Sequence, residues 1–331
     1  MTIPAVGIGR LSLFALRRLA LAVPLLLGVV VVNFVLIQMA PGDPVTVLVG
    51  DYPAPPEYVA EVRREFGLDR PLAERLGRYL AQLAQGNLGY SFANRQPVRD
   101  LIAGRLGATL QLTLTAMVLA TVLGLLLGIV SARARGTALD ALTQGAALSG
   151  YSIPEFWLGQ LLILLFAVWL GWLPSQGNRS LRAPAEGWGA VTDGVRYLIL
   201  PALALSFRYI ALIARLTRSA IVEVLGADFV LAARARGAGE RTVLVGHALR
   251  HAALPVLTVV GYNFGFIFAG SALIETVFAW PGIGRLLFDS IARRDYPVMT
   301  AILLLVSATV VVVNLITDVL YVAVDPRVQL R

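Results

Sequence analysis

The sequence predicts an all-α membrane protein with six transmembrane helices, and three observations lead to this prediction. First, 57% of the 331 residues are hydrophobic, only 15% are charged, and the mean hydropathy is +0.75, which is far from the composition of soluble domains. Second, apolar runs recur that are long enough to cross the hydrocarbon core of a bilayer. Third, arginines cluster at the ends of these runs as the positive-inside rule requires.

The arginines also set the expected orientation of the spans. We expect spans at residues 19–40, 108–132, 156–172, 197–214, 252–278 and 298–324. Arg10, Arg17 and Arg18 precede the first run, which lacks a small-residue cleavage site and is therefore interpreted as an uncleaved span. These arginines, and Arg133 and Arg135 after the second span, indicate the cytosolic side. Both termini are therefore predicted to be cytosolic, in a multi-pass protein of the cytoplasmic (inner) membrane.

The chain divides into three predicted parts. Residues 1–40 hold the N-terminal tail and the first span, residues 41–105 form an extracytoplasmic lobe, and residues 106–331 form the core with the other five spans. The lobe is polar, and helices are predicted in it at residues 56–66 and 72–85. We expect this lobe to be ordered and not to be a linker.

A break is predicted at the third span. A moderately apolar segment from Leu139 leads into it, and Pro154 marks a break or kink because proline cannot continue a helix undisturbed. Trp157, Trp169 and Trp172 suit the aromatic belt at a membrane interface.

A basic stretch at residues 215–255 separates the fourth and fifth spans. Asp228 is predicted to cap a short helix whose last turn holds Arg234. Gly237 follows at the position where a residue in the left-handed conformation ends many helices, and a second helix is predicted from Glu240. Such a long connection between two spans suggests that another molecule docks there.

Several classes of function are disfavoured by composition. The chain has no cysteine, which excludes disulfides and cysteine-based metal or nucleophilic sites. The net charge of +8 is explained by cytosolic arginines and does not require nucleic acid. There is no GxxxxGK[ST] phosphate loop, so ATP binding by this chain alone is not expected. His247 and His251 are four residues apart on a predicted helix, but no third metal ligand is in view.

The basic stretch resembles the signature loop of permease subunits of ABC importers. That signature reads Glu-Ala-Ala, three residues, Gly, nine residues and Ile-x-Leu-Pro. Ala232, Ala233, Gly237 and Leu249 match it at the correct spacing. Three positions depart from it, with Leu231 for the glutamate, His247 for the isoleucine and Arg250 for the proline.

The departures resemble the dipeptide/oligopeptide branch of this family, and the resemblance extends along the whole chain. The supporting motifs, in chain order, are APGDP at 40–44, GNLGYSF at 86–92, SIPEFWLG at 152–159, LILPAL at 198–203, ETVFAWPGIG at 275–284 and DVLYVAVDPRV at 318–328. The resemblance implies a type I ABC importer permease fold. It also implies a second homologous permease subunit, two cytosolic ATPase subunits that bind ATP and Mg²⁺, and an extracytoplasmic substrate-binding protein.

The resemblance further implies that the basic stretch is a coupling loop that contacts an ATPase. The residues assigned to this role are Asp228, Phe229, Ala232, Ala233, Arg234, Arg236 and Gly237. The alternative is a solvated amphipathic hairpin, or a helix that lies on anionic lipid.

Arg208 is the one charge well inside a predicted span, where it costs at least ~2.5–3.5 kcal/mol. It either faces the translocation path and attracts a carboxylate, or it snorkels, or it pairs with Asp318 or Glu155. Asp318 is interpreted as a helix-end or packing residue. Glu275 is predicted to be a solvated carboxylate near Arg285.

The predicted function is transport of peptides through a pathway of which this chain forms half. The alternatives are a permease of the same type for nickel, glutathione or oligosaccharide, and a stand-alone ion-coupled transporter. The stand-alone transporter is less favoured, because such transporters need acidic residues or ion sites within the membrane and the predicted spans contain almost none. An intramembrane hydrolase is disfavoured because both histidines lie in or beside the cytosolic loop.

Overall fold

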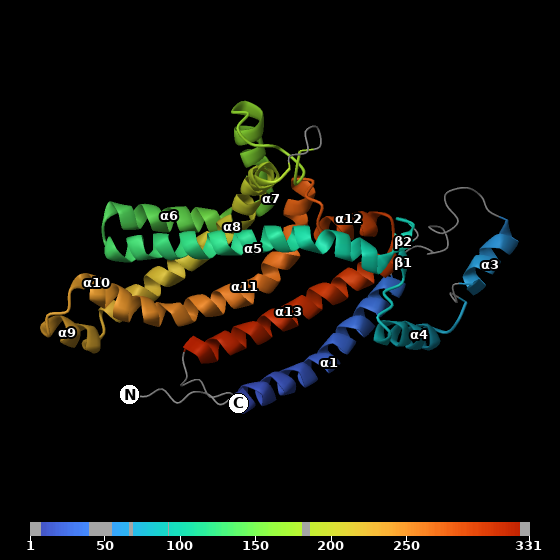
Figure 1. Cartoon of the computed structure of the whole chain (residues 1–331), viewed down its shortest axis with the longest axis horizontal. Helices are drawn as coiled ribbons and strands as arrows, with labels where there is room; N and C mark the ends of the chain where they lie inside the picture. Colours follow the sequence, from blue (N-terminus) through green and yellow to red (C-terminus); the bar gives the residue numbers. More distant parts are fainter. Residues whose placement is uncertain (1–7, 40–54, 66–68, 92, 181–185, 325–331) are drawn as a thin grey trace.

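The computed structural model describes residues 8–39, 55–65, 69–91, 93–180 and 186–324, and most of them form long helices packed side by side (Figure 1). In chain order the elements are α1 (Ile8–Met39), α3 (Pro56–Glu65), α4 (Leu72–Ala84), β1 (Tyr90–Ser91), β2 (Gln96–Pro97), α5 (Val98–Arg133), α6 (Ala138–Ser152), α7 (Glu155–Leu162), the π-helix η1 (Ile163–Trp169), α8 (Trp188–Leu225), α9 (Asp228–Ala235), α10 (Glu240–Thr242), the π-helix η2 (Val243–Ala248), α11 (Leu249–Val277), α12 (Ile283–Ala292) and α13 (Tyr296–Val324).

The apolar helices agree with the six-span prediction. Among the described residues, α1, α5, α8 and α13 are long and apolar enough to cross a membrane. Two bent pairs, α6 with α7–η1 and the two halves of α11, raise the number to six if each pair is one span. Predicted spans two, four, five and six fall within, or within one residue of, α5, α8, α11 and α13. The first span falls in α1 except for residue 40, which lies outside the described residues.

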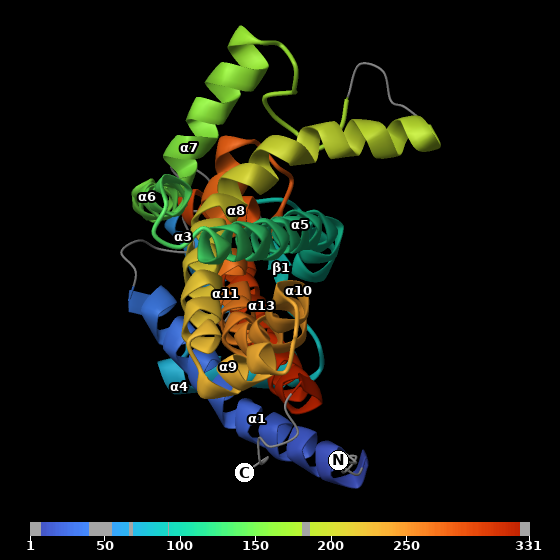
Figure 2. The same cartoon turned by 90° about the vertical axis from the view of Figure 1, so that its left-hand side faces the viewer.

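The third span differs from a single straight helix. The chain bends by 105° between α6 and α7–η1, so the expected break at Pro154 is confirmed. The predicted span at residues 156–172 corresponds to α7–η1, which ends at Trp169 and is long enough to cross a membrane only together with α6. Pro154 disfavours helical geometry at the preceding residue, and Ile153 is extended, with φ −80° and ψ 126°. Figure 1 shows α6 lying along α5, and Figure 2 shows α7 projecting away from the bundle. Trp169, at the end of η1, and Trp172, just after it, are both exposed.

Helix α8 is much longer than the predicted fourth span. It extends from Trp188 to Leu225 and therefore includes the first eleven residues of the basic stretch. Neither glycine nor proline occurs between Arg215 and Leu225, so nothing local ends the helix there. The positive charge of this segment marks a change of environment along one helix and does not mark the start of a loop.

The core is built where α5, α8 and α11 meet. Fully buried Leu112, Leu205 and Ile274 pack in its largest hydrophobic cluster. Two glycines allow α5 to approach α8 closely, as small residues do between membrane helices. A Cβ atom on Gly124 would lie 2.7 Å from the Cβ atom of Ile213, and one on Gly128 would lie 2.7 Å from the carbonyl oxygen of Ala214. Glycine is therefore required at both positions.

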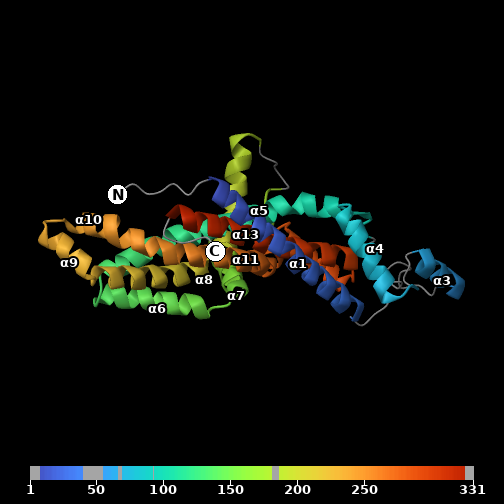
Figure 3. The same ribbon diagram turned by 90° about the horizontal axis from the view of Figure 1, so that it is seen from below.

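The described part of the predicted lobe has the expected helices, and its helix α4 contributes no buried residue. Helices α3 and α4 match the two predicted segments closely. Figure 3 shows α3 and α4 at the opposite end of the molecule from α9 and α10. The lobe is attached by a stacked Phe34–Tyr79 ring pair, 5.7 Å between centroids, and by a hydrogen bond from Ser91 to Asp295. Helix α5 begins at Val98, so residues 98–105, which were assigned to the lobe, belong to α5.

The close approach of α5 and α8 can be tested with two matched substitutions in α5. Gly107→Ala should be neutral or stabilising by up to ~1 kcal/mol, because alanine favours helix and nothing lies within 4 Å of the new Cβ atom. Gly128→Ala should destabilise by about 1–3 kcal/mol, because the helices must separate to admit the methyl group. Thermal unfolding of the purified protein in detergent measures both changes. A melting temperature for Gly128→Ala equal to or above that of Gly107→Ala would contradict the packing described.

Candidate functional site

The hairpin formed by α9, α10 and η2 lies at one end of the molecule, beyond the end of α8 (Figure 1). Its first helix begins one residue earlier than predicted. The N-cap is Ala227, whose carbonyl accepts hydrogen bonds from the backbone of Val230 and Leu231, and it is not Asp228. The predicted cap is wrong because Asp228 already lies in the first turn. The negative charge of Asp228 still suits the positive end of the helix dipole there.

The end of α9 is as the sequence predicts. Gly237 has a φ of +84°, in the left-handed region. Its N–H donates to the carbonyl of Arg234 at 2.9 Å, and the N–H of Ala238 donates to the carbonyl of Ala233 at 3.1 Å. These two bonds are the Schellman pattern that closes a helix at glycine. The predicted start of a second helix at Glu240 is also confirmed, although the chain then continues through η2 into α11 without a break.

The two faces of α9 differ in what they expose. Val230 and Ala233 are buried, whereas Phe229, Leu231 and Ala232 are exposed. The small size of Ala233 therefore serves packing within the hairpin, and Ala232 presents a small side chain to the surroundings. Exposed Phe229 and Leu231 beside it give this face the apolar character of a contact surface.

The charged residues of the predicted coupling loop are divided between two roles. Arg234 is held within the hairpin, because its guanidinium donates to both carboxylate oxygens of Glu240, at 2.9 and 3.2 Å. This bidentate pair bridges the turn around Gly237. Arg236 is exposed in that turn. Of the residues assigned to ATPase contact, Asp228, Phe229, Ala232 and Arg236 are also exposed.

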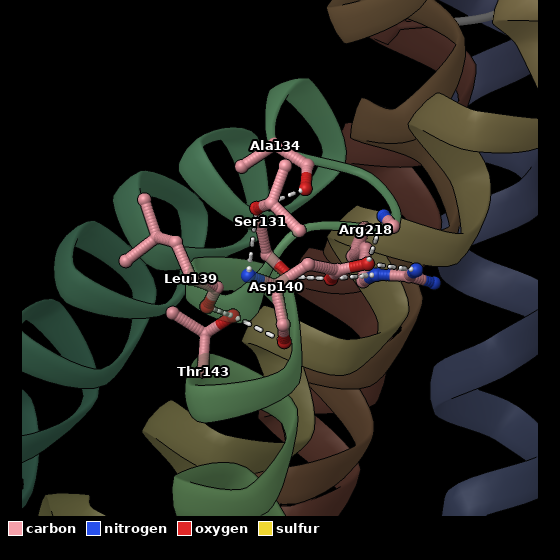
Figure 4. Close-up of polar contacts among 8 residues, drawn as sticks. Ser131, Ala134, Leu139, Asp140, Thr143 and Arg218 are labelled. Carbon is pink, nitrogen blue, oxygen red and sulfur yellow. Dashed lines mark hydrogen bonds and ion pairs between the residues drawn. The ribbon is translucent and has the colours of Figure 1, made fainter.

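An ion pair that sequence analysis missed fixes α8 near the hairpin (Figure 4). Arg218 donates to both carboxylate oxygens of Asp140, each at 2.7 Å. Asp140 also accepts from the hydroxyl of Ser131 at 2.6 Å and from the N–H of Gly136 at 3.1 Å. The Asp140 side chain is 6% exposed and that of Arg218 is 18% exposed. We call this cluster the clamp, because it joins the end of α5, the start of α6 and α8.

One local signal for the clamp was available in the sequence. Thr137 and Asp140 have the spacing of a helix-capping pair, and Thr137 is indeed the N-cap of α6. Capping explains why an acid occurs at position 140. It does not indicate Arg218, which lies 78 residues away.

A groove on the flank of α8 contains the predicted pathway residue Arg208. It has a volume of about 780 Å³ and is lined from the α6–α7 turn, α8 and α11, with Tyr151, Glu155, Arg208 and Asn263 among its polar residues. Arg208 is exposed. Its guanidinium donates a long hydrogen bond of 3.5 Å to the hydroxyl of Tyr151 and lies 4.8 Å from the centre of that ring. The ring therefore orients the positive charge within the groove.

The acidic partners considered for Arg208 behave differently. Asp318 forms an ion pair with Arg18 at 3.0 Å, so of the alternatives for Arg208 the pair with Asp318 is not the one observed, and Asp318 instead ties α13 to α1. Glu155 lines the same groove as Arg208. Within the described part of the chain, however, no ion pair within 4.0 Å joins Glu155 to Arg208.

Glu275 is not the solvated carboxylate that the sequence predicts, because it is fully buried. It accepts hydrogen bonds from the hydroxyl of Thr109 at 2.7 Å and from the backbone N–H of Arg285 at 2.9 Å. The N-terminus of α12 thus surrounds the carboxylate with N–H donors, an environment that stabilises an anion. A Cβ atom on Gly282 would collide with this carboxylate. The role of Glu275 is to fasten α11 to α5 and α12.

Metal binding has no support in the described residues, since no group of three His, Cys, Asp or Glu side chains there could hold an ion. The side chains of His247 and His251 lie outside the described part of the chain, as does the motif at residues 40–44.

Long apolar helices, a charged groove and an ordered hairpin at one end of the bundle are features expected of a membrane transport protein. The chain belongs to the family of binding-protein-dependent transport system inner membrane components, whose model matches residues 124–330. A second model, for the N-terminal part of such membrane components, matches residues 11–113. The chain is therefore a transmembrane permease subunit of an ABC importer.

Relatives are similar over nearly the whole chain. The di/tripeptide transport system permease protein DppB of Pseudomonas aeruginosa is 44% identical over 330 residues, covering 96% of this chain and 98% of the relative. The dipeptide transport system permease protein DppB of Escherichia coli is 40% identical over 333 residues, with the same coverage. The glutathione transport system permease protein GsiC of Escherichia coli is 42% identical over 318 residues, covering 96% of this chain and 99% of the relative.

A solved structure shows the same fold at lower sequence similarity. The inward-facing MetNI methionine ABC transporter has a chain that superposes with a TM-score of 0.53 at 20% identity, covering 68% of this chain and 96% of that chain. This agrees with the predicted type I importer permease fold.

The clamp predicts different outcomes for two arginines three residues apart on α8. Arg218→Leu should destabilise the protein by about 3–5 kcal/mol, because it leaves Asp140 buried without its charged partner. Arg215→Leu, which removes the same charge from an exposed position, should change stability by less than about 0.5 kcal/mol. Adding Asp140→Asn to Arg218→Leu should restore much of the loss, since the uncompensated charge is removed. Thermal unfolding in detergent distinguishes these outcomes, and equal effects of the two arginine substitutions would rule out the clamp.

Proposed function

We propose that this chain forms half of the pathway through which an ATP-driven importer moves short peptides. The observation that carries the proposal is the 44% identity, over 96% of the chain, to a permease named for di- and tripeptides. The relative at 42% identity is named for glutathione, which is itself a tripeptide. Import of glutathione is therefore the second candidate, and both candidates share a small substrate with free carboxylate groups.

The proposed assembly follows from membership of the family. It contains a second homologous permease subunit, two cytosolic ATPase subunits and an extracytoplasmic substrate-binding protein. ATP and Mg²⁺ are held by the ATPases, and this chain binds no cofactor of its own. Both termini and the α9–α10 hairpin face the cytosol, an orientation supported by the arginines before α1 and after α5.

The hairpin is the proposed contact with an ATPase. Its support is the exposed face formed by Phe229, Leu231 and Ala232, together with the pair of Arg234 with Glu240 that stiffens the turn behind it. A stiff element is needed because movement of the ATPase must reach the membrane without being absorbed by a flexible loop. Helix α8, held by the clamp, provides the connection from the hairpin into the bundle.

The groove is the proposed segment of the translocation path. Arg208 supports this because its charge is open to the groove and has no acid within ion-pair distance among the described residues. A guanidinium can hold a carboxylate through two parallel hydrogen bonds. Tight binding would stall transport, so the proposed contact is weak and mediated by water.

The coupling role is tested by enlarging the exposed alanine of α9. Ala232→Trp should lower substrate-stimulated ATP hydrolysis in the reconstituted transporter about tenfold or more, the effect of losing ~1.4 kcal/mol at an interface. The variant should fold as the wild type does, because position 232 is exposed. Ala138→Trp, at an exposed alanine at the start of α6, is the matched control. If both variants hydrolyse ATP as the wild type does, α9 is a solvated hairpin and the coupling role is wrong.

The role of Arg208 is tested by removing its charge. Arg208→Gln should slow transport of a dipeptide with a free C-terminus about two- to tenfold, the effect of one hydrogen bond of ~0.5–1.5 kcal/mol. Transport of the C-terminally amidated dipeptide, basal ATP hydrolysis and melting temperature should be unchanged. A lowered melting temperature that Glu155→Gln restores would instead assign Arg208 to a structural pair.

A further inference from the structure

A second groove lies between α1 and α13, away from the translocation groove. Its volume is about 380 Å³, and its lining includes Arg17, Leu21, Ala22, Leu25, Val311 and Leu315. Figure 1 shows α13 and α1 as the lowermost helices of the bundle, and Figure 3 shows α1 crossing in front of α13. The two helices pack against each other. We call this the α1–α13 groove. No part of the transport function described above requires it.

The groove has a polar end and an apolar end at defined depths. The apolar span of α1 runs from Leu16 to Leu36, so Arg17 lies in its first turn, at the level of the lipid headgroups. Leu21 and Leu25 follow about one and two helical turns deeper, at roughly 1.5 Å per residue. A molecule that fills this groove must therefore place a polar group at the arginine end and a hydrocarbon chain between the two helices.

The charge at the polar end is positive. Arg18 forms its ion pair with Asp318 at 3.0 Å, so an acid of α13 balances one of the two neighbouring arginines. Arg17 lines the groove, is exposed and adds an excess positive charge to this group. The excess charge selects an anion as the polar group of the occupant.

We propose that the α1–α13 groove binds an anionic phospholipid. Its phosphate lies against the guanidinium of Arg17, which matches phosphate geometry with two parallel N–H donors. One acyl chain lies between α1 and α13, along Leu21, Leu25 and Leu315. Basic pockets between transmembrane helices are a recurrent type of site for anionic lipid headgroups. The bound lipid adds contacts between α1 and α13 to those of the Arg18–Asp318 pair.

The proposal is tested with the complete transporter, purified with its partner subunits and depleted of lipid. Phosphatidylglycerol and phosphatidylcholine with the same acyl chains are added back separately, and binding is measured by native mass spectrometry together with the melting temperature. Phosphatidylglycerol should bind more tightly and raise the melting temperature by about 2 °C or more. Arg17→Gln should weaken phosphatidylglycerol binding about fivefold, the effect of one basic residue at an anionic membrane surface, and should leave phosphatidylcholine binding unchanged.

Two further variants and a soluble headgroup define the site. Arg133→Gln removes the same charge from the exposed end of α5, outside this groove, and should leave the affinity for phosphatidylglycerol unchanged. Val311→Trp fills the groove without changing charge and should reduce that affinity. Glycerophosphoglycerol, which lacks acyl chains, should not raise the melting temperature.

Three results would overturn the lipid site. If Arg17→Gln and Arg133→Gln weaken phosphatidylglycerol binding equally, the attraction is diffuse and there is no site. If glycerophosphoglycerol reproduces the stabilisation, the groove does not hold a lipid chain. If Val311→Trp separates the subunits and leaves lipid binding unchanged, the groove is an interface with another protein.

Discussion

The close approach of α5 and α8 is the constraint on which the rest of the structure depends. Gly124 and Gly128 let the two backbones meet where any side chain would collide with Ile213 or with the carbonyl oxygen of Ala214. Helix α11 then packs on both helices to form the main core. Because α8 carries the groove at mid-length and the hairpin at its end, this helix contact sets the position of both functional elements.

Much of the fold could be predicted, because the hydropathy of a segment and the residues that begin or end a helix are local properties of the sequence. The apolar runs indicated the helices that now appear as α1, α5, α8, α11 and α13. Pro154 indicated a break, but the 105° angle depends on how α7 packs against α8 and α11, which no local pattern encodes. The sequence underestimates the length of α8, because positive charge predicts the end of a membrane span but does not end a helix. A helix ends at a helix-breaking residue, and the first such residue after Arg215 is Gly226, the C-cap of α8.

The candidate site shows the same limit. The left-handed turn at Gly237 could be predicted, because it depends only on glycine itself and on the adjacent residues at the end of the helix. Asp140 and Glu275 could not, since their partners Arg218 and Thr109 are 78 and 166 residues away. The sequence predicts a solvated Glu275 and gives no role to Asp140, whereas tertiary packing buries both. Asp318, one of the two acids considered as partners of Arg208, likewise pairs with Arg18, from a helix remote in sequence.

The clamp makes this part of α8 a rigid strut. No glycine or proline interrupts the helix between Arg208 and Leu225, and about one turn before Arg218 the same helix is held against α5 at Ile213 and Ala214. Arg208 and the end of α8 at Leu225 are therefore joined by one continuous helix about 25 Å long, at 1.5 Å per residue. A helix fixed at two successive points cannot pivot at one of them, so a displacement of the hairpin reaches the groove only if α5 and α8 move together.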